Sequence, residues 1–152
     1  MEALSLPGSG FWIGVVVAIV CGAIVGYERQ LKDKPVGART SILICLGTQI
    51  FVDIGSAFTT PSADPTRVIG QVVTGIGFIG GGVILARRGI VVGVTTASTI
   101  WVLAAIGVVI GVGHYLTALM LSIVTVIILI GFDYIDKRIL AGKAGKKSPD
   151  DE

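Results

Sequence analysis

Asp53 is a charged residue inside an otherwise uncharged, apolar segment of the sequence. It lies in residues 40–63, a segment with no other charged side chain. A charge at the centre of a bilayer costs ~3 kcal/mol on insertion scales, so such residues usually face the protein interior and mark function. Gln49 precedes Asp53 by one helical turn, and Gln71 is expected at a similar depth in the following segment. These side chains predict a polar cluster, in which Asp53 is either a ligand for Mg²⁺ or a protonated carboxyl bonded to a backbone carbonyl.

A second polar group surrounds Glu28, at the end of the first apolar segment. Arg29, Lys32 and Arg39 follow it in the chain, within reach of its carboxylate. Arginine suits such pairs better than lysine because its planar guanidinium can hold a carboxylate through two hydrogen bonds. Two interpretations stay open: an ion-pair network that fixes the turn between two helices, or a binding site in which Glu28 is a further candidate metal ligand.

Hydroxyl groups and glycines form a third candidate group. Thr95, Thr96 and Thr99 lie at the start of one apolar segment. A glycine-rich run, residues 74–82, lies at the end of the segment before it. The hydroxyls either satisfy backbone groups freed by the glycines or act as oxygen ligands for Mg²⁺ or its water shell. The run is either a flexible helix or a helix that unwinds where protein surrounds it. Its candidate positions are Gly77, Gly80 and Gly81.

The residues do not indicate an enzyme. The pattern G-x-G-x-x-G occurs at residues 75–80, but a dinucleotide site also needs an acidic residue about 20 positions later. No Asp or Glu occurs between Asp64 and Asp133. His114, the only histidine, has no metal-ligand set or catalytic partners around it. We therefore predict no catalysis and no cofactor other than Mg²⁺.

The composition of the chain sets the environment of these groups. Of its 152 residues, 53% are hydrophobic and 14% are charged, whereas a soluble domain carries roughly 25% charged residues. The net charge of +2 is too small for a nucleic-acid-binding protein. A soluble enzyme domain and a disordered chain are also excluded, which leaves an integral membrane protein surrounded by lipid.

Charge-free segments predict how often the chain crosses the bilayer, because one crossing takes about 20 apolar residues. The longest such segment, residues 89–132, must hold two helices, with a break at residues 111–114, where two glycines and the histidine interrupt it. We therefore predict an all-α fold, a compact bundle of five transmembrane helices. The predicted helices lie near residues 8–27, 40–59, 66–86, 92–111 and 114–133.

Basic residues predict the orientation of this bundle. All of them except Arg67 fall in the first loop, the third loop or the C-terminal region. Positive loops stay in the cytoplasm, so the N-terminus is expected outside and the C-terminus inside. We expect one transmembrane domain, residues 1–140, followed by a short, disordered cytoplasmic tail, residues 141–152.

Small residues predict close helix packing. Gly14, Ala18, Gly22 and Gly26 recur every four residues and share one helix face. The same spacing recurs at Gly77 and Gly81 and at Gly107 and Gly111. Inside lipid, helices associate through such close contacts because there is no hydrophobic drive between them. These faces either pack within one bundle, the interpretation that we favour, or form a dimer.

Three blocks of this sequence resemble the MgtC/SapB family of bacterial membrane proteins. The first comprises residues 22–30 (GAIVGYERQ) and 34–40 (KPVGART), and the second comprises residues 75–82 (GIGFIGGG). The third runs from residues 94–101 (VTTASTIW) into 104–107 (AAIG). The resemblance implies five helices with the N-terminus outside, in the bacterial plasma (inner) membrane.

The resemblance also implies a role in growth at limiting magnesium and, in some pathogens, in survival within host cells. Magnesium transport and the regulation of other membrane proteins have both been proposed for the family. Many members carry a cytoplasmic C-terminal domain of the ACT type, and this chain resembles a short form without it. The family pattern supports Glu28, Arg29, Arg39 and Thr96 as important positions.

Two hypotheses of function follow. The first is a protein that binds or transports a divalent cation, with Asp53 and Glu28 as the metal ligands. The second is a regulatory membrane protein, involved in stress adaptation or virulence, that binds another membrane protein through its helices and transports nothing. A homodimer is compatible with either hypothesis, and we predict one.

Overall fold

The computed structural model describes residues 8–57, 64, 66–87 and 90–144. The predicted five helices are confirmed, and a two-stranded antiparallel hairpin joins the third helix to the fourth. The elements are α1 (Ser9–Leu31), α2 (Ala38–Ala57), α3 (Thr66–Gly82), β1 (Leu85–Arg87), β2 (Ile90–Val92), α4 (Val94–Gly111) and α5 (Tyr115–Ala144).

Four of these helices, α1, α2, α4 and α5, are long and apolar enough to cross a membrane. The remaining helix, α3, has 17 residues, a length of about 25 Å at 1.5 Å per residue. The structure therefore has the five predicted helices, and four of them have the length and composition of a membrane span.

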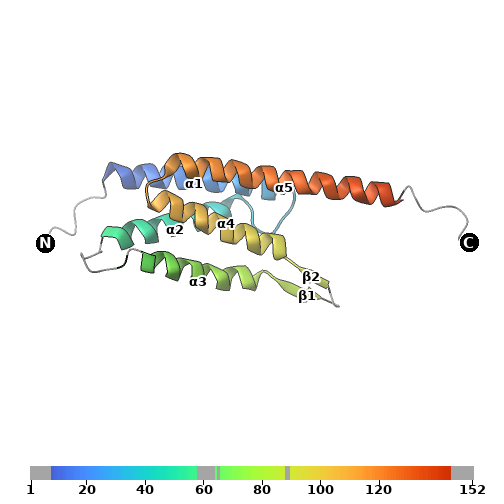
Figure 1. Ribbon diagram of the computed structural model, residues 1–152, viewed down its shortest axis with the longest axis horizontal. Coiled ribbons are helices and arrows are strands. Elements are labelled where there is room, and N and C mark those ends of the chain that lie inside the picture. The colour runs from blue at the N-terminus through green and yellow to red at the C-terminus, as the bar shows by residue number, and fades with distance from the viewer. Residues whose placement is uncertain (1–7, 58–63, 65, 88–89, 145–152) are drawn as a thin grey trace, which may run out of the picture.

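The helices run up and down along one common direction (Figure 1). Helix α1 packs on α2, α2 packs on α4, α5 lies along α1 and α4, and α3 lies against α4. The α1–α2 turn, the hairpin and the start of α4 lie at the same end of the bundle, which we call the hairpin end (Figure 1). Helix α5 extends beyond the other helices at this end.

Glycines bring the central helices close together. A Cβ atom on Gly22 would lie 2.5 Å from Cα of Ile42, and one on Gly107 would lie 2.7 Å from the carbonyl oxygen of Cys45. Such contacts leave no room for a side chain, so these glycines are needed for the backbones of α1, α2 and α4 to approach. The prediction of packing within one bundle is confirmed for these faces.

Two predicted boundaries are wrong. The third helix was expected to reach residue 86 but ends at Gly82, because its glycine run is a poor helix former and residues 85–87 pair with the β-branched strand Ile90–Val92. The fifth helix was expected to end near residue 133 but continues to Ala144. No proline interrupts residues 134–144, so helical bonding continues past the apolar segment. The rest of the expected tail, residues 145–152, lies outside the described residues.

Candidate functional site

Lys32 lies between two carboxylates at the hairpin end. Its Nζ atom is 2.6 Å from Oε1 of Glu28, one turn earlier in the chain, and 2.6 Å from Oδ2 of Asp133 in α5. The Glu28 side chain is 6% exposed, and a charged carboxylate buried in this way needs a partner. Lys32 therefore connects the end of α1 to α5 through paired charges.

The two carboxylates also affect the pKa of Lys32. Burial lowers this pKa, but the hydrogen bonds and charges of Asp133 and Glu28 outweigh the effect of burial and raise it above the ordinary value of 10.5. Lys32 therefore stays protonated at physiological pH. A metal ion bound between Glu28 and Asp133 would have to displace this ammonium group.

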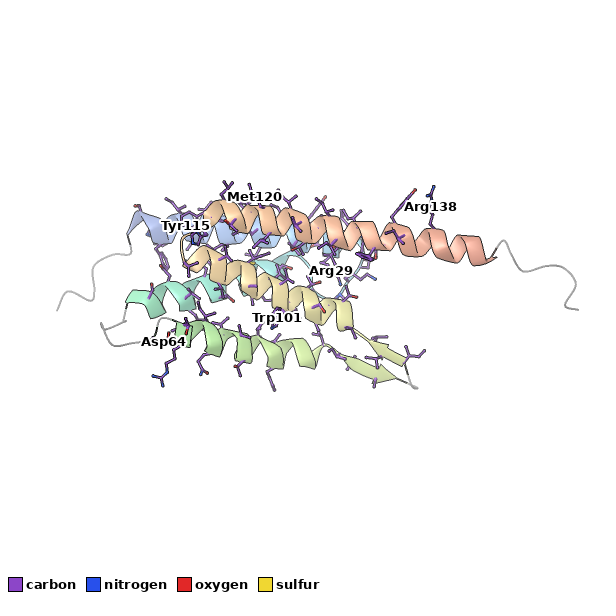
Figure 2. The ribbon with its side chains drawn as sticks, in the orientation of Figure 1. Arg29, Asp64, Trp101, Tyr115, Met120 and Arg138 are labelled. Carbon is purple, nitrogen blue, oxygen red and sulfur yellow. The ribbon has the colours of Figure 1, made fainter. Side chains whose placement is uncertain are left out.

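Arg29, next to Glu28 in α1, bonds to α4 instead of to a carboxylate. Its Nη2 atom donates a hydrogen bond to Oγ1 of Thr96 at 3.0 Å, and the residue is 3% exposed. Figure 2 labels Arg29 close to the hairpin-side part of α4. Among the described side chains Arg29 forms no ion pair, and its Nε atom is buried without a hydrogen-bond partner. A positive charge is thus buried here without a counter-ion.

A pocket of about 450 Å³, which we call the Arg29 pocket, opens beside this guanidinium. The turn after α1 contributes Lys34, and Asp133 of α5 lies on another side. The hairpin supplies an apolar wall that includes Leu85 and Val91. Arg29 therefore lines a space bounded by three regions that are distant in sequence: the end of α1 with its turn, the hairpin with the start of α4, and α5.

The first turn of α4 also lines the Arg29 pocket, and its backbone N–H groups lack helical hydrogen bonds. The first amide with a helical partner is that of Ala97, which donates to the carbonyl of Gly93 at 2.8 Å, and no side chain caps the helix. The N–H groups of Val94, Thr95 and Thr96 therefore have no partner within the helix. Gly93 has φ +93°, and a Cβ atom there would collide with the carbonyl oxygen of Val83, so only glycine allows this tight entry into α4.

The other hydroxyl and basic candidates have different surroundings. Thr95 lines the Arg29 pocket. Thr99 is buried, and its Oγ1 atom donates to the carbonyl of Thr95 at 2.8 Å, so it satisfies the backbone of its own helix. Arg39 is exposed on α2 and forms no ion pair with any described residue. The expected reach of Arg39 to Glu28 is therefore not seen, because Lys32 takes that carboxylate.

The glycine run of α3 is helical throughout, so the unwinding considered from the sequence is not seen. Gly80 is buried, and a Cβ atom there would lie 3.6 Å from the carbonyl oxygen of Ala97 in α4. Gly77 and Gly81 would have nothing within 4 Å of such an atom. The face of the run with Gly80 therefore packs against α4, whereas the face with Gly77 and Gly81 has open space beside it.

No hydrogen bond joins Asp53, Gln49 and Gln71 in the described part of the chain, and the Oε1 atom of Gln49 is buried without a hydrogen-bond partner. Gln49 is 1% exposed, and its Nε2 atom lies 3.0 Å from the place of a Cβ atom on Gly14 of α1. Gln71 is exposed and lines a groove of about 620 Å³ between α2 and α3. Gln49 therefore lies against α1, whereas Gln71 lines the groove between α2 and α3. Asp53 is half-buried, and its backbone carbonyl accepts a hydrogen bond from Ser56.

The surroundings of Asp53 and Glu28 limit how these two carboxylates could bind a metal ion. Within the described part of the chain no three His, Cys, Asp or Glu side chains gather in a group that could hold a metal ion. Mg²⁺ is commonly held by one or two carboxylates together with water molecules. Asp53 is free to provide one carboxylate, whereas the Oε1 atom of Glu28 lies against the Lys32 ammonium.

Sequence reasoning missed Asp133 and Gly93. Asp133 is the first acidic residue after Asp64 and directly follows the longest charge-free segment. Its position in an antiparallel bundle would have placed it at the depth of Lys32. Gly93 stands between an apolar run and the segment that begins with Val94, and glycine is one of the residues that helices accept at the N-cap.

Residues 15–138 match the MgtC family. The chain belongs to the MgtC family. This membership agrees with the resemblance inferred from the sequence, and the match includes every member of the site at the hairpin end. Together with the four apolar helices, it identifies a multi-pass membrane protein.

Individual relatives in the MgtC family support this assignment. The Escherichia coli K12 protein named "Putative magnesium transporter YhiD" is 44% identical over 95 residues, which cover 58% of this chain and 44% of that protein. "Protein MgtC" of Salmonella typhimurium LT2 is 39% identical over 89 residues, covering 59% of this chain and 38% of that protein. The similarity thus spans less than half the length of these relatives. No solved structure matches the chain.

Proposed function

We propose that this chain serves magnesium homeostasis in a bacterial plasma membrane as a regulatory membrane protein, not as a passage for Mg²⁺. Its place in the MgtC family and the name of its Escherichia coli relative support the link to magnesium. The arrangement of charges at the hairpin end supports regulation, with Arg29 and Lys32 at its centre.

The hydrogen bond from Arg29 to Thr96 is the observation that carries this proposal. It joins α1 to α4 inside the bundle, while Lys32 joins α1 to α5. A ligand bound beside Arg29 would therefore act on the contacts of three helices at once. Such a site can change the relation between helices, which is what a regulator requires.

Close packing of the central helices favours regulation over transport. At Gly22, Gly107 and Gly111, the neighbouring helix lies too close for even a methyl group. A hydrated cation has no room between the helices at these contacts. Lys32 also places a positive charge between the two carboxylates of the hairpin end.

Binding of a divalent cation at Asp53 is a second candidate function. The Asp53 side chain is half-buried in a predicted span and forms no ion pair with any described residue. A carboxylate placed in this way commonly marks an ion site in membrane proteins. This observation supports Asp53 as a candidate binding site for a divalent cation.

Flux into proteoliposomes separates the two candidates. We expect the purified wild-type protein to give no Mg²⁺ uptake above that of protein-free liposomes, with circular dichroism showing that it is folded. Saturable uptake that is lost in Asp53→Asn and kept in Asp33→Asn would overturn the regulatory proposal. Asp33 is a suitable control because it is an exposed carboxylate in the turn after α1.

A second copy or another membrane protein remains the proposed partner of the regulator. The small-residue face of α1 is used within the bundle, since Gly22 and Gly26 pack on α2. The open small-residue face belongs to α3, where Gly77 and Gly81 lie beside Phe78, which is 86% exposed. We therefore place the predicted homodimer contact on α3.

A further inference from the structure

We propose that the Arg29 pocket binds a phosphate-type oxyanion, either a free phosphate group or the headgroup of an anionic phospholipid. This inference deepens the proposed function, because it names the ligand class of the regulatory site and rests on that proposal for its biological role. The binding itself rests only on the geometry of the pocket.

The missing counter-ion of Arg29 is the first argument. A charge that is 97% removed from solvent is costly unless it is paired and hydrogen-bonded, and Arg29 is 3% exposed. Lys32 engages both nearby carboxylates, and Arg29 forms no ion pair with any side chain that the structure describes. Of the five N–H donors of a guanidinium, one hydrogen bond is made, to Thr96. An anion in the pocket would supply the counter-charge and accept from the remaining donors.

The start of α4 is the second argument, and it points to the same place. The N–H groups of Val94, Thr95 and Thr96 have no helical partner, and these three residues line the same pocket as Arg29. Free amides and the helix dipole make such an end a binding site for phosphate. The helix has 18 residues, so its dipole is fully developed. A buried guanidinium without a counter-ion, lining the same pocket, distinguishes this helix start from an ordinary one.

The shape and remaining charges of the pocket narrow the ligand class. Lys34 adds a second cation, and the hydroxyl of Thr95 adds a donor. Asp133 also lines the pocket, but its carboxylate is paired with Lys32. Several donors converging from different directions suit the oxygens of a tetrahedral anion better than a planar carboxylate. The volume of about 450 Å³ and the apolar hairpin wall leave space for an organic group attached to the phosphate.

Titration of the purified protein with inorganic phosphate tests this assignment for a free phosphate source. The protein is kept in a zwitterionic detergent at constant ionic strength, and binding is measured by isothermal titration calorimetry. We expect one site in the wild-type protein and at least tenfold weaker binding in Arg29→Gln. The matched control is Arg67→Gln, which removes an exposed arginine at the opposite end of the bundle and should bind like the wild type.

Native mass spectrometry tests the lipid source with the same variants. The protein is mixed with phosphatidylglycerol or with phosphatidylcholine, and the lipid retained after detergent removal is measured. Retention of phosphatidylglycerol that Arg29→Gln loses and Arg67→Gln keeps identifies a lipid headgroup. Phosphate binding without selective lipid retention identifies a free phosphate group. Both results support an oxyanion site, and they differ only in its source.

Two results would overturn the proposal: wild-type protein that retains neither probe, or Arg29→Gln and Arg67→Gln variants that bind alike. If Arg29→Gln does not fold, Lys34→Gln decides, because Lys34 lies on an exposed turn. We expect it to weaken binding at least threefold, and unchanged binding would contradict the assignment. Absence of Mg²⁺ flux together with absence of anion binding would leave the regulatory function standing and reject only its ligand.

Discussion

Glu28 and Arg29 are neighbours in the chain, yet the bundle uses their charges differently. Glu28 is held by Lys32, whose ammonium also contacts Asp133. Arg29 reaches across to Thr96 and has no acidic partner among the described residues. The sequence predicted that these side chains gather at the membrane boundary. It could not assign partners, because the choice depends on Asp133, which α5 brings from a distant part of the chain.

The role of Lys32 can be measured by its removal. In Lys32→Met, Glu28 remains buried without a counter-charge, so the free energy of unfolding should fall by roughly 3 kcal/mol, the scale for breaking one half of a buried pair. Denaturant unfolding in detergent micelles measures this change. The matched control is Lys34→Met on the exposed turn, where we expect a change within about 0.5 kcal/mol. Equal losses in the two variants would contradict the paired role of Lys32.

At the scale of elements, glycine has opposite roles in α1 and α3. Gly22 of α1 touches the backbone of α2, whereas Gly77 of α3 has open space beside it. Spacing alone predicted both as packing faces, since each has a small residue four positions away. The sequence could not separate them, because only the arrangement of the helices shows which faces are covered. The hairpin was missed for a related reason: its first strand begins inside residues 66–86, the segment that was predicted as the third helix.

Alanine at these two glycines distinguishes the covered face from the open one. Gly22→Ala places a Cβ atom 2.5 Å from Cα of Ile42, and overpacking of this kind costs about 1–3 kcal/mol. Gly77→Ala meets no neighbour and gains helix propensity, so its stability should be unchanged or slightly higher. Thermal unfolding in detergent, followed by circular dichroism, gives the comparison. A lower melting temperature for Gly77→Ala than for Gly22→Ala would refute the packing described for α1.

Cross-linking tests the proposed contact between two copies through α3. A cysteine at Gly77 should form a covalent dimer when native membranes are treated with a short bismaleimide linker. The control is Gly131→Cys on α5, where a Cβ atom also has nothing within 4 Å. Dimers from Gly131→Cys alone would move the contact to α5, and the absence of dimers from both would reject the homodimer.

At the scale of the molecule, the distribution of charge orients the bundle. Every basic residue except Arg67 lies in residues 29–39, around the α1–α2 turn, at residues 87–88 or in the region from Lys137 onward. We therefore propose that the hairpin end faces the cytoplasm. The number of helices could be predicted from the lengths of the charge-free segments, and the break before α5 from the glycines and the histidine of residues 111–114. The Arg29 pocket could not, since its walls come from α1, the hairpin, α4 and α5.

Labelling of single cysteines in intact cells tests this orientation. Cysteines at Lys34 and Arg138 should react with a membrane-impermeant maleimide only after permeabilisation, whereas a cysteine at His114 should react in intact cells. The native Cys21 and Cys45 are buried and should stay unlabelled. Labelling of Lys34→Cys and Arg138→Cys from opposite sides would contradict the bundle as a whole.

Growth at limiting magnesium tests the central claim most directly, that the protein works through the charges at the hairpin end. The wild-type chain and two variants are expressed at equal levels in a bacterium whose own family member is deleted. We predict that Arg29→Gln loses the growth supported by the wild type, while Asp53→Asn keeps it. Full growth with Arg29→Gln and none with Asp53→Asn would contradict the account and place the function at Asp53.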